Sequence, residues 1–296
     1  MVDTSGEADI RGLFIQKLAT GFAEEDIIFK RFIRNSTTSA REIRWYQKTS
    51  GFLDSTDTTG ITASQIRHVP QLALPDVIEQ SITRNSSTVE KFMAESPWIS
   101  FEDIKDNDPN ILSINVRDIT RAVAKQVDAA IWDVMTESRV SLGQSINEVT
   151  ASGAWSGSFA TANPVKDLNS AEKLIRQSAY ATSNLTLFIN AASHASLKDW
   201  LITKAGSSIP AFSSQAVQSG VVMTLLGHSV VVSENVTSGY GVLADGKEAV
   251  NYMQFMALKA QQKEEPLIGL KIRVAEEGVA LLENPKAVTL LSGIGT

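Results

Sequence analysis

The chain has 296 residues, with 27 basic and 33 acidic side chains, so its formal net charge is −6. A hydrophobic content of 43% is too high for a disordered chain, and a negative total argues against a general nucleic-acid binder. The absence of cysteine excludes a disulfide framework, zinc–thiolate and iron–sulfur sites, and a thiol nucleophile.

The remaining composition favours a soluble globular protein without a metal or cofactor. Its three histidines, His68, His194 and His228, lie far apart and form no metal-binding spacing. Apolar runs such as residues 220–226 are much shorter than the roughly 20 residues that span a membrane. The first ten residues carry three acidic side chains and no basic one, so we expect no secretory or mitochondrial leader.

The first forty residues are weakly patterned. Apolar side chains between residues 10 and 22 recur at near-helical spacing, and the polar residues 35–39 favour a turn. We therefore expect a small helix and an extended arm over residues 1–40, and no self-sufficient domain.

Residues 41–74 have the pattern of a projecting β-hairpin. Residues 42–46 alternate, with Ile43 and Trp45 on one side, and residues 66–74 form a second extended stretch that ends at Pro75. A long polar segment, rich in turn-forming residues, joins the two. Because an isolated two-stranded ribbon is only marginally stable, we expect it to pack against something else.

A short helix is expected at residues 77–82, and a much longer one follows over residues 116–139, with Asn115 as its N-cap. Apolar side chains on one helical face define the long helix: Ile119, Val123, Val127, Ala130, Ile131, Val134 and Met135. The basic residues Arg117, Arg121 and Lys125 recur on it every four positions. This stripe fits a solvated face or a surface that meets acidic groups of a neighbouring chain or a polyanion.

Small residues dominate positions 150–163, which we interpret as a crossing between domains anchored by Trp155 and Phe159. Asn169 is expected to cap a helix that ends at Ala181. The later elements alternate: we expect strands at 185–189, 221–226, 229–233, 250–258, 268–282 and 287–291, a helix at 194–204, and a break in the C-terminal strands at Gly278.

The sequence contains no recognisable catalytic motif. Phosphate-binding loops and the GxSxG nucleophile elbow are absent from the sequence. The pairs Glu264-Glu265 and Glu276-Glu277 are expected to be exposed, and neighbours in a strand face opposite sides, so neither pair would share a proton. Alternating aspartates at 103, 106 and 108 lack the glycine and the distal glutamate of a calcium loop. His194 and His228 are more readily structural than catalytic.

The order of these elements resembles the HK97-fold major capsid proteins of tailed bacterial and archaeal viruses. Three segments carry the likeness: Leu185–Asn190 followed by a helix over 195–201, the stretch Leu226–Ser233 (LGHSVVVS), and Ile272–Ala280 followed by Asn284–Ala287. The resemblance implies an α+β HK97-like capsid fold. It divides the chain into an N-terminal arm (1–40), an extended β-hairpin loop (41–74), a peripheral domain with a long spine helix (75–142), an axial domain (143–260) and return strands of the peripheral domain (261–296).

The resemblance also implies a function: self-assembly into hexamers and pentamers of an icosahedral head shell around double-stranded DNA. The chain would then be a structural protein of the virion, assembled in the host cytoplasm, and not an enzyme. Its expected partners are its own copies, a separate scaffolding protein, a portal, a decoration protein and, by weak nonspecific contact, the packaged DNA; no membrane is expected. Candidate contacts between subunits are Trp45, Tyr46, Lys48, Phe52, Arg117, Arg121 and Lys125.

Some members of that family crosslink a lysine of the extended loop to an asparagine of a neighbour. Lys48 and Asn284 are the matching residues here, and we expect no crosslink between them. Two other functions compete with a virus head. One is an encapsulin-like compartment of the same fold, and the other is an intracellular α+β enzyme that depends on His194 or Asp199.

Overall fold

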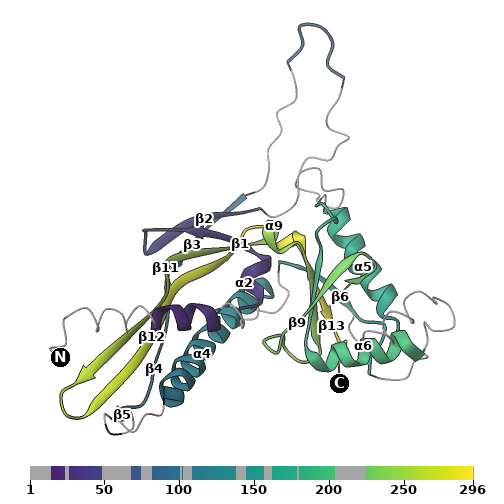
Figure 1. Ribbon diagram of the computed structural model, residues 1–296. Helices are drawn as coiled ribbons and strands as arrows, with labels where there is room; N and C mark the ends of the chain where they lie inside the picture. The colour runs from purple at the N-terminus through teal and green to yellow at the C-terminus, as the bar shows by residue number, and fades with distance from the viewer. Residues whose placement is uncertain are drawn as a thin grey trace.

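The computed structural model describes residues 15–23, 27–48, 68–74, 82–100, 102, 109–137, 145–156, 162–178, 180–203 and 224–295. Two bodies lie side by side, each built on its own sheet (Figure 1). We call them the α4 body and the α5–α6 body, after the helices that cover their sheets.

The sheet of the α4 body has the strand order β1-β11-β12-β4, and β5 also pairs with β12. Its strands are β1 (Arg34–Thr37), β4 (Glu90–Glu95), β5 (Ile99–Ser100), β11 (Val250–Glu265) and β12 (Gly269–Leu282). Alternate residues of β12 face opposite sides of the sheet. Val274 packs on the side of α4, whereas Val279 and Leu281 pack against Ile43 on the other side. β12 is therefore covered on both faces.

Helix α4 (Pro109–Met135) is the long spine helix, and its 27 residues extend over roughly 40 Å. It begins earlier than the predicted residue 116, since proline is well tolerated in the first turn of a helix. It also ends earlier than the predicted residue 139. Asn115 lies inside the helix and is not its N-cap, so that prediction is wrong. The predicted apolar face is confirmed: Val123, Val127, Ala130, Ile131 and Met135 are buried, and Ile119 and Val134 are partly buried.

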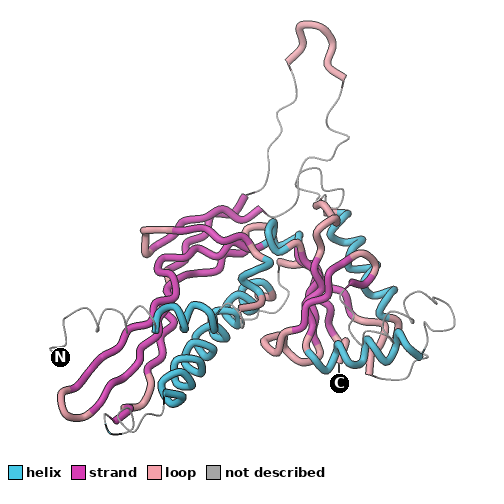
Figure 2. The backbone as a smooth tube through the Cα atoms, viewed as in Figure 1, coloured by secondary structure: helices cyan, strands magenta, loops and turns pink. Residues whose placement is uncertain are grey.

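The sheet of the α5–α6 body has the order β6-β13-β10-β7-β9-β8. Its strands are β6 (Asn147–Thr150), β7 (Thr186–Ile189), β8 (Thr224–Leu225), β9 (His228–Val232), β10 (Tyr240–Ala244) and β13 (Val288–Ser292). Helices α5 (Pro164–Gln177) and α6 (Ala191–Thr203) lie beside it (Figure 2). Their apolar side chains form one cluster with Leu187 and Leu243. Phe188 and Val242 instead join the C-terminal half of α4, which links the two bodies.

Two local predictions for the α5–α6 body have different outcomes. The N-cap of α5 is Asn163, whose side chain accepts from the Lys166 N–H, so the prediction of Asn169 is wrong. Pro164 in the first turn explains the earlier start. Trp155 is confirmed as an anchor: it is buried, and its indole N–H donates to Asp167 at 3.1 Å. Phe159 lies outside the described residues.

The projecting hairpin begins as predicted, but its second strand comes from a later segment. Strand β2 (Glu42–Lys48) pairs with β3 (Ile82–Thr88), and not with residues 66–74. Residues 68–74 form a turn without strand pairing, and Pro70 within them has no N–H to donate to a ladder. The predicted helix over 77–82 is wrong at Ile82, which starts β3; the rest of it lies outside the described residues.

Two further segments depart from the sequence predictions. Residues 35–39 were expected to form a turn, yet residues 34–37 form β1, which pairs in parallel with β11. Strand β12 runs through Gly278 without a break, and a Cβ there would overlap the phenol ring of Tyr252. Short segments α2 (Phe29–Phe32), α9 (Gly246–Ala249) and η2 (Pro285–Ala287) lie where the two bodies meet (Figure 1).

Candidate functional site

The β2–β3 ribbon is firmly fixed at its base. The Trp45 indole N–H donates to the Ser87 hydroxyl at 3.1 Å, and the Lys48 N–H donates to the Glu283 carbonyl at 3.0 Å. Trp45 is half-buried against the apolar clusters below the ribbon. Tyr46 points the opposite way and is 62% exposed, and Lys48 is exposed as well. The alternation along 42–46 is therefore confirmed, and it leaves Tyr46 and Lys48 on an open face.

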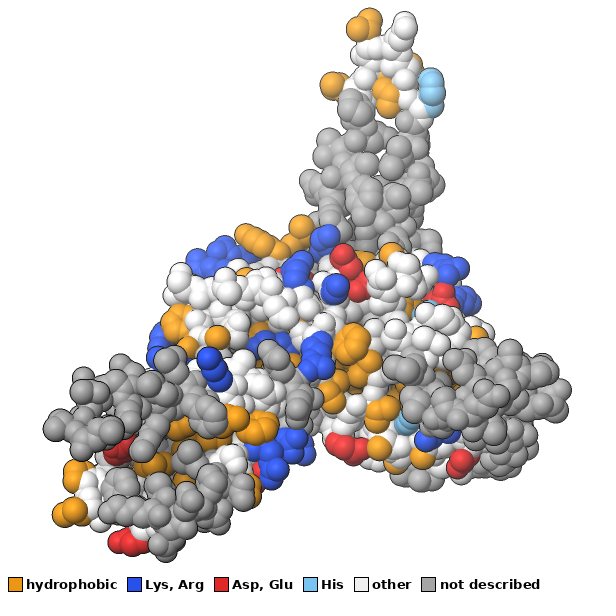
Figure 3. All heavy atoms as spheres, viewed as in Figure 1, with side chains coloured by type: hydrophobic (Ala, Val, Ile, Leu, Met, Phe, Trp, Pro, Cys, Tyr) orange, Lys and Arg blue, Asp and Glu red, His pale blue; other side chains and the backbone are white. Residues whose placement is uncertain are grey.

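Residues 68–74 lie far from both bodies (Figures 1 and 3). Two of their apolar side chains have almost no contact with the rest of the subunit: Leu72 is fully exposed and Leu74 is 93% exposed, whereas Val69 is 37% exposed. Two leucines in water at the end of a projection are costly for a monomer and are typical of a surface that another molecule covers. Local pattern did not reveal this surface, because residues 66–74 were expected to form a strand.

A second apolar surface lies at the turn between β11 and β12. Leu267 is 97% exposed in a left-handed backbone conformation (φ 65°), and Ile268 beside it is 54% exposed. Trp98 is 40% exposed nearby, with the Lys271 ammonium 4.7 Å from its ring centroid. Turns normally carry polar residues, so leucine at this position is a signal that the sequence contained and that we did not use.

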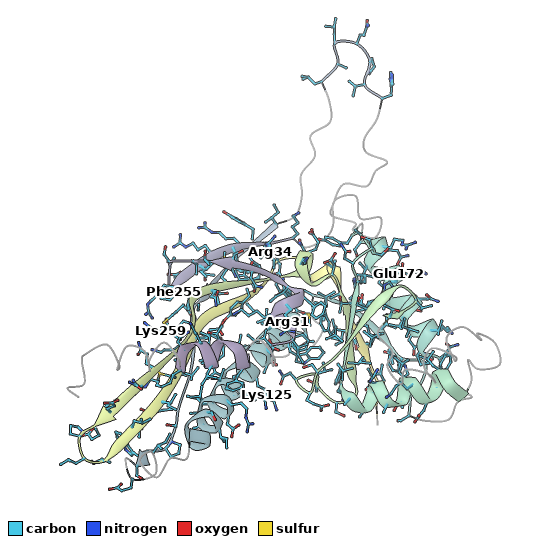
Figure 4. The ribbon with its side chains drawn as sticks, in the orientation of Figure 1. Arg31, Arg34, Lys125, Glu172, Phe255 and Lys259 are labelled. Atoms are coloured by element: carbon cyan, nitrogen blue, oxygen red, sulfur yellow. The ribbon has the colours of Figure 1, made fainter. Side chains whose placement is uncertain are left out.

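The basic stripe lies on α4, on the opposite side of the sheet from the β2–β3 ribbon. Arg117 is 3.0 Å from Asp118, and Arg121 is exposed. Lys125 is exposed as well (Figure 4). The candidate contact residues therefore divide into two separate surfaces. Trp45, Tyr46 and Lys48 belong to the ribbon, the three basic residues belong to the helix, and Phe52 lies outside the described residues.

The adjacent carboxylates Glu276 and Glu277 were expected to be exposed, and that prediction is wrong. Both are buried, at 0% and 5% exposure, because β12 is covered on both faces. Glu277 faces the ribbon side, where Lys91 lies at 3.4 Å and Arg41 at 3.8 Å. Because neighbouring residues of a strand point to opposite faces, the carboxylates of Glu276 and Glu277 are buried on opposite sides of the sheet.

Glu276 faces the other side of the sheet, where it meets α2. Its Oε1 atom lies 2.5 Å from the Lys30 ammonium and accepts from the Tyr252 hydroxyl at 3.2 Å. The same ammonium lies 4.9 Å from the centroid of the Tyr252 ring. Burial, followed by the negative charge of Glu276, raises the pKa of Tyr252 well above its usual range. The phenol therefore stays neutral and donates to the carboxylate.

Asp128 on α4 holds the start of α2. Its buried carboxylate accepts from the backbone N–H groups of Ile28 at 2.6 Å and Phe29 at 3.2 Å, as an N-cap residue would, although it is a hundred positions away in the sequence. Burial raises the pKa of Asp128 to about 6, against the lowering effect of these hydrogen bonds and of Lys30.

This shift predicts a pH dependence for the stability of the subunit. Because the pKa of Asp128 is about 6 in the folded state, against 3.8 for an aspartate in water, the folded state binds the proton more tightly. The contribution of Asp128 is therefore largest below pH 4 and declines by about 3 kcal/mol as the pH rises through 6. Asp128→Asn, which cannot ionise but still accepts a hydrogen bond, should flatten this part of the profile. Denaturant unfolding between pH 4 and 7 measures it, and an unchanged slope in the variant would contradict it.

Of the remaining candidates for chemistry, His228 takes part in a contact between a strand and a helix. His228 is buried with Nε2 3.4 Å from Glu172, which itself pairs with Arg176, and this arrangement joins β9 to α5. Within the described ranges, no group of three or more potential metal ligands occurs, and no helix is long and apolar enough to cross a membrane. The alternating aspartates at 103, 106 and 108 lie outside the described residues.

Comparison with known proteins gives a family and a fold. A family model described as "Phage capsid protein" matches residues 85–290, which is 206 of the 296 residues. A search of curated protein sequences gave no match.

Several solved structures share the fold at low sequence identity. The capsid structure of the cyanophage P-SCSP1u has a TM-score of 0.67 at 13% identity, over 91% of this chain and 89% of that one. A protein of Mycobacterium phage Che8 has a TM-score of 0.63 at 14% identity, over 91% and 92% of the two chains. A virus-like particle from Pyrococcus furiosus has a TM-score of 0.63 at 10% identity, over 95% and 99%. The predicted α+β HK97-like capsid fold is thereby confirmed.

Proposed function

Because the chain belongs to the phage capsid protein family, we propose that its copies join as hexamers and pentamers into an icosahedral head shell that encloses double-stranded DNA. As a member of this family, the chain is a structural protein of the virion shell. The observation that supports assembly most directly is the pair of leucines, Leu72 and Leu74, exposed at the end of a projection. Contacts of this kind, repeated around a symmetry axis, close into rings.

The proposed division of the chain agrees with the two bodies except at two strands. The α4 body holds the spine helix of the peripheral domain (75–142) and β12 of its return strands (261–296), and the α5–α6 body holds most of the axial domain (143–260). Strand β11 (Val250–Glu265), however, lies in the sheet of the α4 body, and β13 (Val288–Ser292) lies in the sheet of the α5–α6 body. The extended loop, first assigned to residues 41–74, is better bounded by β2 and β3, so we propose that it runs to Thr88. Within the proposed arm (1–40), residues 27–37 pack on their own subunit through α2 and β1.

We assign three surfaces to contacts between subunits. The first is the ribbon with Tyr46 and Lys48 and the apolar residues at 68–74, and the second is the β11–β12 turn with Leu267 and Ile268. The third is the basic stripe on α4, which fits acidic groups of a neighbour or the phosphates of packaged DNA. A separate scaffolding protein, a portal and a decoration protein are the further partners of a shell assembled in the host cytoplasm.

Electron microscopy of the expressed chain tests this function. Closed icosahedral particles that contain DNA in infected cells would support a virus head. A protein compartment without a genome is the second candidate, because the fold of the virus-like particle from Pyrococcus furiosus matches 95% of this chain. Particles filled with a cargo enzyme would favour that compartment, and discrete small oligomers would contradict both.

We predict that the shell is not covalently crosslinked through Lys48 and Asn284. Asn284 is buried, its amide N–H donates to the Glu248 carbonyl at 2.5 Å, and its oxygen accepts from Tyr180 at 3.3 Å, so both amide atoms are engaged within the subunit. A denaturing gel of boiled particles should show one band near 32 kDa. A ladder of heavier bands that disappears in Lys48→Arg would overturn the prediction.

A further inference from the structure

Three aromatic rings from distant parts of the chain meet where the two bodies join. Phe29 of α2 lies 5.7 Å from Trp132 of α4 and 5.1 Å from Phe188 of β7, measured between ring centroids. All three side chains are buried, at 0%, 2% and 0% exposure. Phe32 adds an edge-on contact with Phe188 at 5.8 Å. Segment α2 therefore fills the space between α4 and the six-stranded sheet.

Among the described residues, the polar side-chain contacts of α2 and of Arg34, which starts β1, are made with the α4 body. The Asp128 carboxylate of α4 binds its first N–H groups, Lys30 pairs with Glu276 of β12, and Arg34 pairs with Glu283 just after β12. These partners all belong to the α4 body or its edge. The aromatic side chains of α2, by contrast, face Phe188 of the other body.

The chain crosses between the bodies close to α2. Segment α9 leads from β10 into β11, and η2 leads from β12 into β13. These crossings are tied together, since the Glu283 N–H donates to the Ala249 carbonyl at 2.9 Å. The end of α2 lies in close contact with the start of α9, since a Cβ on Gly246 would be only 2.6 Å from the Phe32 carbonyl oxygen. Only glycine leaves room for this approach.

We infer that α2 is an internal wedge that fixes the angle between the α4 body and the α5–α6 body. Short crossings of this kind can act as hinges, because a few residues absorb the change in backbone angles. Close-packed aromatic rings resist compression, so a wedge beside the hinge selects one angle. In a shell, the angle within each subunit enters the curvature at which neighbours join; this consequence rests on the proposed function, whereas the wedge itself does not.

The test measures the angle directly in Phe29→Leu, which shortens the wedge but keeps an apolar side chain. Because the chain has no cysteine, Ala195→Cys on α6 and Lys263→Cys on β11 place one spin label on an exposed position of each body. The labelled chain is diluted with unlabelled chain, and the distance between the labels is measured by pulsed electron spin resonance. We expect the width of the distance distribution roughly to double in Phe29→Leu, since contacts across the junction are lost.

Phe22→Leu is the matched control, because Phe22 packs in the distal core of the α4 body, away from the junction. It should lower stability without changing the distance distribution. If Phe29→Leu does not fold, Phe32→Leu removes the milder edge-on contact and takes its place. A distribution in the wedge variant that is as narrow as in the wild type and in Phe22→Leu would overturn the inference, whether or not shells form. Where shells form, the wedge variant should also give a wider range of diameters.

Discussion

Lys30→Met is expected to lower the free energy of unfolding by about 3–5 kcal/mol, the usual cost of leaving one partner of a buried ion pair without the other. The carboxylate of Glu276 has no solvent exposure, and its second oxygen has no hydrogen-bond partner among the described residues. Without the ammonium, the negative charge stays buried with only the Tyr252 hydroxyl and the Gln254 amide to stabilise it. Denaturant unfolding near neutral pH measures the loss.

Two matched variants define the source of this effect. Arg34→Met removes a cation only four residues away, whose pair with Glu283 is 48% exposed on the arginine side, so we expect a loss of only about 0–1 kcal/mol. Lys30→Met combined with Glu276→Gln removes both charges and should recover most of the stability. A loss in Lys30→Met no larger than in Arg34→Met would show that the buried pair contributes little.

The double substitution Leu72→Asp and Leu74→Asp is expected to prevent assembly while the subunit remains folded. Burying a leucine side chain is worth about 1.5–3 kcal/mol, so the loss of both weakens each contact by roughly 10²-fold or more. Because these side chains barely touch their own subunit, its stability should stay as in the wild type. Size-exclusion chromatography with electron microscopy measures the loss of particles, and circular dichroism checks the fold.

The control keeps the apolar character at the same positions. Leu72→Met with Leu74→Met should assemble nearly as well as the wild type, because methionine fills a comparable volume. Normal particles from the aspartate variant would show that residues 68–74 are not a contact between subunits. Unfolded subunits would instead mean that this segment supports its own subunit.

Several features of the fold could be predicted from short stretches of sequence. The apolar face of α4 follows from helical spacing, and the buried Leu187 and the long strands β11 and β12 follow from local hydrophobic pattern. Their order along the chain carried the resemblance to a capsid fold. Such patterns can be recognised in the sequence because each depends only on residues a few positions apart, within one or two turns of a helix or along one strand.

Other features were wrong or missed because their causes lie elsewhere in the chain. The N-cap of α5 was placed at Asn169 instead of Asn163, since several residues near its start can cap a helix. The partner of β2 was chosen by proximity, whereas β3 lies beyond residues 68–74 and pairs in its place. Leu72 and Leu267 carried a signal in composition, but only their exposure distinguishes a contact surface from a core.

The sequence by itself determined the type of the long elements α4, β11 and β12, the buried face of the spine helix and the family, because these depend on local periodicity and on order. The tertiary structure alone decided which charges are buried and what they do. Glu276 and Glu277 are adjacent acidic residues that look solvent-exposed in any local window. They are buried because β12 is central and covered on both faces, and Lys30, Lys91 and Arg41 reach them from segments up to about 250 positions away. The role of Asp128 as a cap for α2 is equally a consequence of packing across a hundred residues.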